Sequence, residues 1–342
     1  MPAPRILHAA PTVAIPGGLL RITGESLTDP EFPLTVQIGE TPLRPLVASP
    51  THLLLPIPPG ASSGPLVVQV GGERGEGPPI TVATLVAAGL HPVGNPAVDG
   101  AGMIYTTKSG ARGEKVPLPL FRIGPTGELT PLPHEITNPT GMAVGPDGSL
   151  FVTSRNDGTL WRIPPDGERE IYARDLGIAT GVVIDTAGGI IVGDRRGRIL
   201  RVDGPHRTSP VATLPPSIAA YHLALGPAGE LYVTAPSLSL DDPIYCVHPD
   251  GRVEHFAEWF RRPQGIACDA DGSLYVVAER DEGRGIYRVT GRGETITFVV
   301  AGANLVGCAL DPPRNRFLLT TTTAVYTLPW PLPSPDERAE QD

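Results

Sequence analysis

Short apolar runs separated by polar turns recur along most of the chain, and in two places the recurrence is nearly literal. The stretch PTGMAVGPDGSLFVTS begins at Pro139, and PQGIACDADGSLYVVAE begins at Pro263. Each contains a glycine, a short apolar run, a turn built on Asp and Gly, and a second run. Alternation of apolar and polar positions is typical of a half-buried β-strand, and Pro, Asp and Gly suit β-turns. The pattern therefore predicts antiparallel strands joined by tight turns.

One complete unit of this pattern is expected to contain four strands. In the unit that begins at Gly141, residues 141–144 predict a short inner strand and residues 149–154 an alternating second strand. Residues 159–165 predict the third strand and residues 168–174 the outer fourth strand. GPDG connects the first strand to the second, and an Asp-Gly turn connects the third to the fourth.

The units repeat with a nearly constant period. The position four residues before the turn is held by Asn95, Gly141, Gly181, His222, Gly265 and Gly307, with spacings of 46, 40, 41, 43 and 42 residues. A repeat of about 40–45 residues with several alternating strands is the signature of a β-propeller blade. The sequence therefore predicts an all-β fold whose larger part, residues 86–330, is a six-bladed β-propeller.

The sixth unit lacks an outer strand of its own. After the run AVYTLPW the chain enters a charged, proline-rich segment, residues 331–342, which we expect to be a flexible tail. The missing strand is expected from residues 82–90, ahead of the first unit. Such a strand would tie the two ends of the ring together and cover free sheet edges.

The first 85 residues do not follow the repeat. They contain short apolar runs punctuated by proline and glycine, such as LLRITGESL, LTVQIGE and GPLVVQVGG. Runs of this length and spacing are typical of a small antiparallel β-sandwich. We therefore predict an immunoglobulin-like sandwich over residues 1–85, and the lack of a long linker predicts that it packs against the propeller rim.

Both halves resemble known families. PRILHAAPTVAIPGGLLRITGESL resembles the opening of IPT/TIG immunoglobulin-like domains. The two repeated stretches resemble NHL repeats and the six-bladed propellers of the senescence-marker (SMP-30)/gluconolactonase family. That second resemblance implies a hydrolytic site at the top of the central channel. It also implies one divalent cation there, held by a Glu of the first blade and by Asn and Asp residues where later inner strands begin.

The corresponding positions of this chain do not provide such a metal site. The residues immediately before the aligned positions are Gly94, Thr140, Thr180, Tyr221, Gln264 and Val306. A hard cation such as Ca²⁺ needs several oxygen ligands, mostly carboxylates or amides, and only Gln264 offers an amide. Asn95 and Asn304 lie one or two positions out of register. The sequence therefore predicts no metal and no cofactor, with Ca²⁺ or Zn²⁺ expected only if the hydrolase alternative holds.

The loops of the two propeller faces differ in how much they vary. The turns after the first and third strands are nearly identical from unit to unit, whereas the loops of the opposite face differ in length and charge. Binding residues concentrate in variable loops on a rigid scaffold. We therefore expect a ligand site on the variable face, with these candidates: Thr140, Thr180, Asp194, Arg195, Tyr221, His222, Gln264 and Glu279.

Each group of candidates also has a structural interpretation. His222 replaces the usual glycine and would point into the channel, or it would be bonded to a loop carbonyl. Residues 194–196 could bind an anion through the planar Arg fork, or could form a solvated loop tip. Residues 241–242 and 279–281 could place carboxylates over the channel, or could be ordinary surface. Lys108 occupies the position of Asp194 in the first unit and could supply a counter-charge.

Charge and motifs exclude several other classes of function. The net charge of −9 argues against nucleic-acid and anionic-membrane partners, which both need a basic surface. No run approaches the roughly 18 apolar residues of a membrane span. The chain opens without a signal-peptide pattern, so we expect a cytoplasmic location, with an exported form left open. Cys246, Cys268 and Cys308 form no CxxC pair and are expected to pack as small apolar residues.

Two functions stay open at this point. The first is a non-catalytic scaffold that binds a small molecule, a carbohydrate or a protein partner on its variable face, which the unsuitable metal positions favour. The second is a lactone or ester hydrolase with an altered site, such as His222 with Asp241 or Glu279. Convergence of at least three oxygen-bearing side chains at the channel mouth would distinguish the second from the first.

Overall fold

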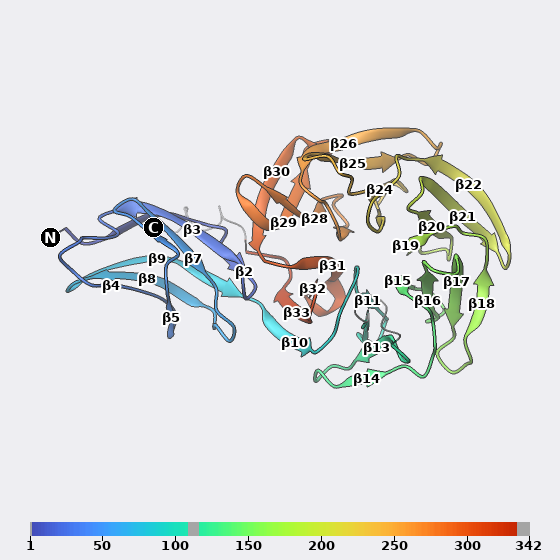
Figure 1. Ribbon diagram of the computed structural model, residues 1–342, viewed down its shortest axis with the longest axis horizontal. Coiled ribbons are helices and arrows are strands. Elements are labelled where there is room, and N and C mark those ends of the chain that lie inside the picture. Colours follow the sequence, from blue (N-terminus) through green and yellow to red (C-terminus); the bar gives the residue numbers. More distant parts are fainter. Residues whose placement is uncertain (1, 109–115, 334–342) are drawn as a thin grey trace.

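The computed structural model describes residues 2–108 and 116–333, and these are built almost entirely of β-strands. A ring of sheets surrounds a central channel, and the N-terminal domain lies beside the ring (Figure 1). The described part contains two short 3₁₀ helices, η1 (Gly291–Gly293) and η2 (Pro312–Arg314). No helix in the described ranges has the length and apolar character needed to cross a membrane.

The ring consists of six antiparallel blades of four strands each, and in the first five blades the strands follow chain order from the channel outward. Blade 1 contains β11 (Ala97–Val98), β12 (Ile104–Thr107), β13 (Leu120–Ile123) and β14 (Leu129–Pro131). Blade 2 contains β15 (Pro139–Val144), β16 (Leu150–Ser154), β17 (Thr159–Ile163) and β18 (Glu170–Ala173). Blade 3 contains β19 (Ala179–Ile184), β20 (Ile190–Asp194), β21 (Arg198–Gly204) and β22 (Arg207–Thr213).

The remaining blades complete the circle. Blade 4 contains β23 (His222–Leu225), β24 (Leu231–Thr234), β25 (Asp242–Val247) and β26 (Val253–Phe260). Blade 5 contains β27 (Ile266–Cys268), β28 (Leu274–Arg280), β29 (Gly283–Thr290) and β30 (Thr295–Ala301). Blade 6 contains β31 (Leu305–Asp311), β32 (Arg316–Thr321) and β33 (Ala324–Pro329), with β10 (Thr84–Ala88) as its outer strand. The prediction of a propeller is confirmed.

The ring is closed by the strand that precedes the first blade in the chain. Strand β10 pairs antiparallel with β33, from Thr84 opposite Thr327 to Ala88 opposite Ala324. The expected closing strand is therefore confirmed. Of the predicted tail, residues 334–342 lie outside the described residues, and Leu332 packs against the core that blades 5 and 6 share.

The blades are held together by packing and by a recurring hydrogen bond. All five residues of β16 are buried, because each sheet lies between two neighbouring sheets. In three blades, a threonine near the end of the second strand donates its hydroxyl to a carbonyl at or just before the start of the next blade's inner strand. The pairs are Thr153 to Thr180 at 3.3 Å, Thr234 to Gln264 at 2.5 Å and Thr320 to Gly94 at 2.9 Å.

The N-terminal domain consists of two packed sheets. One contains β1 (Arg5–Ala10), β3 (Leu19–Glu25), β7 (His52–Pro56) and β6 (Val47–Ala48). The other contains β5 (Thr41–Leu43), β4 (Leu34–Ile38), β8 (Gly64–Val70), β9 (Glu73–Val82) and β2 (Val13–Ala14). Their apolar faces share one core that includes Leu20, Ile22, Ile38, Leu55 and Val68.

Strand β2 joins this domain to blade 5. It pairs in parallel with β9 on one side and with β30 on the other, where Ala14 lies opposite Ala301. The result is one nine-stranded sheet that runs through both domains. Arg21 adds a hydrogen bond of 2.9 Å to the carbonyl of Asp281. The N-terminal domain therefore shares a hydrogen-bonded sheet with blade 5, whereas the sequence predicted only packing against the propeller rim.

Candidate functional site

The central channel is lined by the inner strands of all six blades and has a cavity volume of about 380 Å³. We call the side on which these strands begin the variable face, and the side with the GPDG-type turns the turn face. Channel residues near the variable face are buried: Gly94, Thr140, Thr180, Tyr221 and His222. Channel residues near the turn face are half-buried and apolar: Val98, Val144, Ile184, Leu225 and Leu310. These side chains at the variable-face end are therefore more enclosed than those at the turn-face end.

His222 is buried at the variable-face end of the channel. Its side chain reaches from blade 4 to blade 1, where a Cβ atom on Gly94 would lie 3.5 Å from the ring. Burial lowers the pKa of His222 to about 4, so the imidazole is neutral at pH 7. Within the described residues its side chain has no hydrogen-bond partner, so the expected bond to a loop carbonyl is not formed.

Asn95 spans the channel wall at the same level. Its side-chain nitrogen donates to the carbonyl of Ile266 in blade 5 at 2.9 Å, and its side-chain oxygen accepts from the amide of Cys308 in blade 6 at 3.1 Å. Both ends of the amide group are therefore occupied by backbone. This geometry fixes three blades relative to one another and leaves Asn95 unsuited to a metal ion.

Three of the predicted ligand residues have structural contacts in the channel wall. The hydroxyl of Thr180 accepts from the amide of Tyr221 at 3.0 Å, and the hydroxyl of Thr140 donates to the carbonyl of Asn138 at 3.3 Å. The phenol of Tyr221 donates to the carbonyl of Pro215 at 2.5 Å, and burial raises the pKa of that phenol. These contacts satisfy the polar groups of the buried side chains.

The channel does not fit the divalent cation that the fold family implies. None of the described residues that line it is Asp or Glu. Asp241 and Glu279, which the hydrolase alternative paired with His222, are not part of the lining. Burial also raises the pKa values of the two thiols in the wall, to about 12 for Cys268 and further for Cys308, so neither is a thiolate at neutral pH. Among the described residues, neither cysteine of the wall is therefore an activated nucleophile.

Asp194 organises its own loop in blade 3. Its carboxylate is fully buried and accepts from the amides of Ile178 and Arg196 and from the guanidinium of Arg198. Burial alone would raise the pKa of Asp194, but these donors outweigh burial and lower it. Arg195 is half-buried and donates to the carbonyl of Ile218 at 3.3 Å. Residues 194–196 are therefore more than a solvated loop tip, and Asp194 has no lone pair directed at a ligand site.

The remaining two predicted residues, Gln264 and Glu279, lie together in a second pocket. It lies between blades 5 and 6 on the variable face and has a volume of about 310 Å³. The loops that enter blades 5 and 6, and the loops that follow β28 and β32, form its walls. Its polar lining residues are Arg261, Arg262, Gln264, Glu279, Arg284, Asn304 and Thr322.

Two of the three arginines in this pocket are paired. Arg284 contacts Glu279 at 2.6 Å, and Arg261 contacts Asp281 at 3.0 Å. Arg262 has no ion pair or side-chain hydrogen bond within the described residues. Its backbone lies in the left-handed region, with φ of 48°. One exposed guanidinium therefore stands beside the pocket with its donors unused.

Two side-chain amides that line the same pocket also lack hydrogen-bond partners among the described residues. The backbone of Gln264 is engaged at both ends, with its amide donating to Val277 and its carbonyl accepting from Thr234. The side-chain amides of Gln264 and Asn304 have no partner among the described residues. Together with Arg262 they offer donors and acceptors to a ligand of several polar groups.

Sequence reasoning found only part of this pocket. Arg262 belongs to the short basic run WFRRP, which gives no sign of a binding site. Asn304 is out of register with the metal positions that the gluconolactonase resemblance implies. The signal that could have found them is that both lie in loops leading into inner strands, as Gln264 does. Loop 302–304 also lies close to the N-terminal domain, since a Cβ on Gly17 would lie 3.4 Å from the Cβ of Ala303.

No protein-family model matches the chain, and no curated protein matches it in sequence. Solved structures are similar in fold. An auxiliary nutrient binding protein from Bacteroides thetaiotaomicron VPI-5482 is 14% identical, with 96% of this chain and 98% of that chain covered and a TM-score of 0.52. XC5397 from Xanthomonas campestris, described as a gluconolactonase, is 18% identical over 73% of this chain and 88% of that chain, with a TM-score of 0.57.

A third similar structure is virginiamycin B lyase from Staphylococcus aureus. It is 19% identical, with 73% of this chain and 87% of that chain covered and a TM-score of 0.50. At these identities the likeness establishes the β-propeller fold alone, because one fold hosts many activities. The likeness to the nutrient binding protein extends over nearly the whole of both chains.

Proposed function

We propose that this protein is a binding propeller whose ligand is a sugar-sized organic anion, held between blades 5 and 6 on the variable face. The observation that carries the proposal is a set of three polar side chains around one pocket, Arg262, Gln264 and Asn304, none of which has a side-chain partner among the described residues. A guanidinium binds a carboxylate through two parallel hydrogen bonds, and amides bind hydroxyl groups. The ligand is therefore expected to carry one carboxylate and several hydroxyls.

The size and setting of the pocket support the same proposal. A volume of about 310 Å³ is at the small end of ligand sites, which suits a single sugar unit. The pocket walls are loops between strands of a rigid ring, and blade 5 is continuous with the N-terminal domain. We propose that this domain is an IPT/TIG-type immunoglobulin-like sandwich and that the blades are NHL-type repeats. The whole-chain likeness to an auxiliary nutrient binding protein agrees with a binding role.

The hydrolase alternative has weaker support. A gluconolactonase has the same fold, but the channel of this chain is lined by no carboxylate among its described residues. A hydrolase of this type would need a group there to activate water or to polarise the carbonyl. The binding proposal needs neither.

Titration calorimetry with D-gluconate, D-glucuronate and neutral D-glucose tests the proposal. We expect one site per chain for an anionic sugar, at least about tenfold weaker binding of glucose, and weaker binding at high salt. Equal affinity for glucose, or no binding of either anion, would contradict the proposal. Hydrolysis of glucono-lactone above its spontaneous rate would support the alternative.

A further inference from the structure

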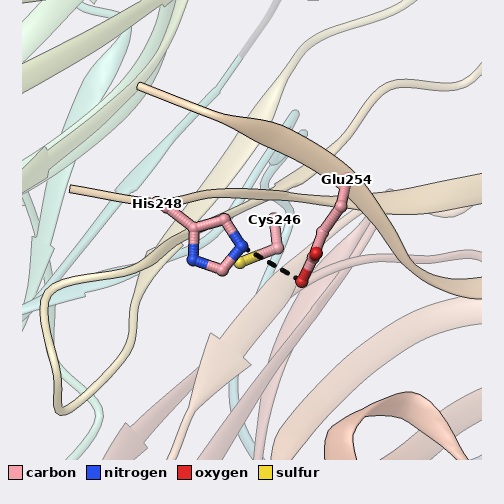
Figure 2. Close-up of side chains that lie close together, drawn as sticks. All are labelled: Cys246, His248 and Glu254. Atoms are coloured by element: carbon pink, nitrogen blue, oxygen red, sulfur yellow. Dashed lines mark ion pairs between the residues drawn. The ribbon is translucent and has the colours of Figure 1, made fainter. Parts of the chain in front are cut away.

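Three side chains of metal-ligand type meet at the turn-face end of blade 4. Cys246 lies near the end of β25, His248 follows two residues later, and Glu254 lies on β26 (Figure 2). Cys246 and Glu254 are directly opposite each other in the ladder between the two strands. Residues two apart on a strand point to the same side of the sheet, so all three side chains share one face.

The donor atoms are close enough to share one ion. Nε2 of His248 lies 3.1 Å from Oε1 of Glu254, and each residue has a donor atom within 4.8 Å of the other two. Bond lengths of about 2.0–2.3 Å at a tetrahedral Zn²⁺ place ligand atoms roughly 3.3–3.6 Å apart. The imidazole and carboxylate, at 3.1 Å, are slightly closer than this spacing, and the thiol, within 4.8 Å of both, reaches it by a small rotation of its side chain.

The same corner contains two buried polar atoms with no hydrogen-bond partner in the described chain. One is Nε2 of His248, whose approach to Glu254 does not have the angles of a hydrogen bond. The other is Oε2 of Glu230. Leu231 pairs with Val247, so Glu230 and His248 are the next residues along the two neighbouring strands. Buried polar atoms without partners are costly; a cation bound here would satisfy His248, and Glu230 lies beside His248 in the ladder.

We propose that Cys246, His248 and Glu254 bind one Zn²⁺ ion, with Glu230 or a water as the fourth ligand. A thiolate, an imidazole and a carboxylate are the donors that Zn²⁺ takes, whereas Ca²⁺ and Mg²⁺ prefer oxygen donors only. The ion would join β26, the outer strand of blade 4, to the strands inside it. This site lies on the turn face, whereas the pocket of the proposed function lies on the variable face, so the two proposals stand independently.

Cobalt titration of the untagged full-length protein, stripped of metal with a chelator, tests the site. We expect one Co²⁺ per chain, with the near-ultraviolet absorption that a thiolate–cobalt bond produces. Zn²⁺ should displace the cobalt and raise the thermal midpoint by a few degrees, because it binds only the folded state. A folded wild-type protein without this absorption overturns the proposal.

Matched variants identify the ligands. Cys246→Ser should abolish the thiolate absorption, whereas Cys268→Ser, a change at a half-buried cysteine of blade 5, should leave it unchanged. Glu254→Gln changes an exposed side chain and should weaken Co²⁺ binding at least tenfold without affecting folding. An absorption that survives Cys246→Ser, or an affinity that Glu254→Gln leaves unaltered, would overturn the assignment.

Discussion

Thr320 in blade 6 donates a hydrogen bond of 2.9 Å to the carbonyl of Gly94 in blade 1, across the seam where the ring closes. The threonine is fully buried. Thr153 and Thr234 make the corresponding bond to the following blade. In blades 2, 4 and 6, a threonine at the same position of the second strand therefore connects neighbouring blades as well as filling the core.

We predict that Thr320→Val destabilises the protein by about 1–3 kcal/mol, because valine keeps the shape and leaves a buried carbonyl without its donor. Thr323→Val, an exposed change three residues later, is the control and should shift stability by less than about 0.5 kcal/mol. Urea unfolding gives both values. Equal losses in the two variants would show that the seam bond contributes nothing.

The buried His222 predicts a dependence of stability on acid pH. Its pKa is about 4 in the folded protein and about 6.5 when unfolded, so the unfolded chain binds the proton more tightly. Stability is then lost as the pH falls from about 6.5 toward 4, by up to about 3 kcal/mol. His222→Gln removes the titrating group. The unfolding free energies of the two proteins should diverge over this range, and parallel curves would exclude the buried neutral imidazole.

The tight junction between the domains predicts that one added methyl group at Gly18 lowers the stability of the protein. A Cβ atom on Gly18 would lie 2.4 Å from the carbonyl oxygen of Ala301 in β30. Gly18→Ala should therefore destabilise the protein by about 1–3 kcal/mol, as overpacking does. Gly72→Ala, at a position with open space around it, is the matched control. Thermal unfolding of both variants checks this, and a Gly18→Ala protein as stable as the control would contradict the tight junction.

The sequence predicted the ring better than the junction. The period of the repeats fixed the blades, and the incomplete last unit pointed to the closing strand near Thr84. Strand β2 was not predicted, because two residues carry no periodicity and its parallel partners lie far away in the chain. Pairing across distant segments leaves no local pattern for sequence reasoning to use.

The surroundings of the candidate site residues also depend on contacts between distant segments, which the sequence pattern does not show. Tyr221 and Thr180 were chosen for their positions where inner strands begin, but sequence position alone did not reveal that neighbouring blades would bury them. Gln264 and Glu279 were chosen one by one, and only the fold places them in one pocket with Arg262. The meeting of Cys246 with Glu254 depends on strand register, which the spacing of the cysteines could not show.

The ion pair between Arg284 and Glu279 should limit the affinity of the pocket for anions. Glu279→Gln removes a negative charge and releases the guanidinium that contacts it at 2.6 Å. We expect an anionic sugar to bind about five- to tenfold more tightly to this variant. Glu282→Gln, at a carboxylate that is not part of the pocket lining, is the control. Weaker binding to Glu279→Gln would instead mean that Glu279 itself contacts the ligand.

The most direct measurement is titration calorimetry of D-glucuronate against the wild-type protein, Arg262→Ala and Arg292→Ala. Both arginines are exposed, lack side-chain partners in the described residues and have left-handed backbone, but only Arg262 lines the pocket between blades 5 and 6. The two variants therefore change charge and backbone strain equally. We predict at least about tenfold weaker binding for Arg262→Ala and wild-type binding for Arg292→Ala. Equal affinities of all three proteins would contradict the assignment of this pocket as the ligand site.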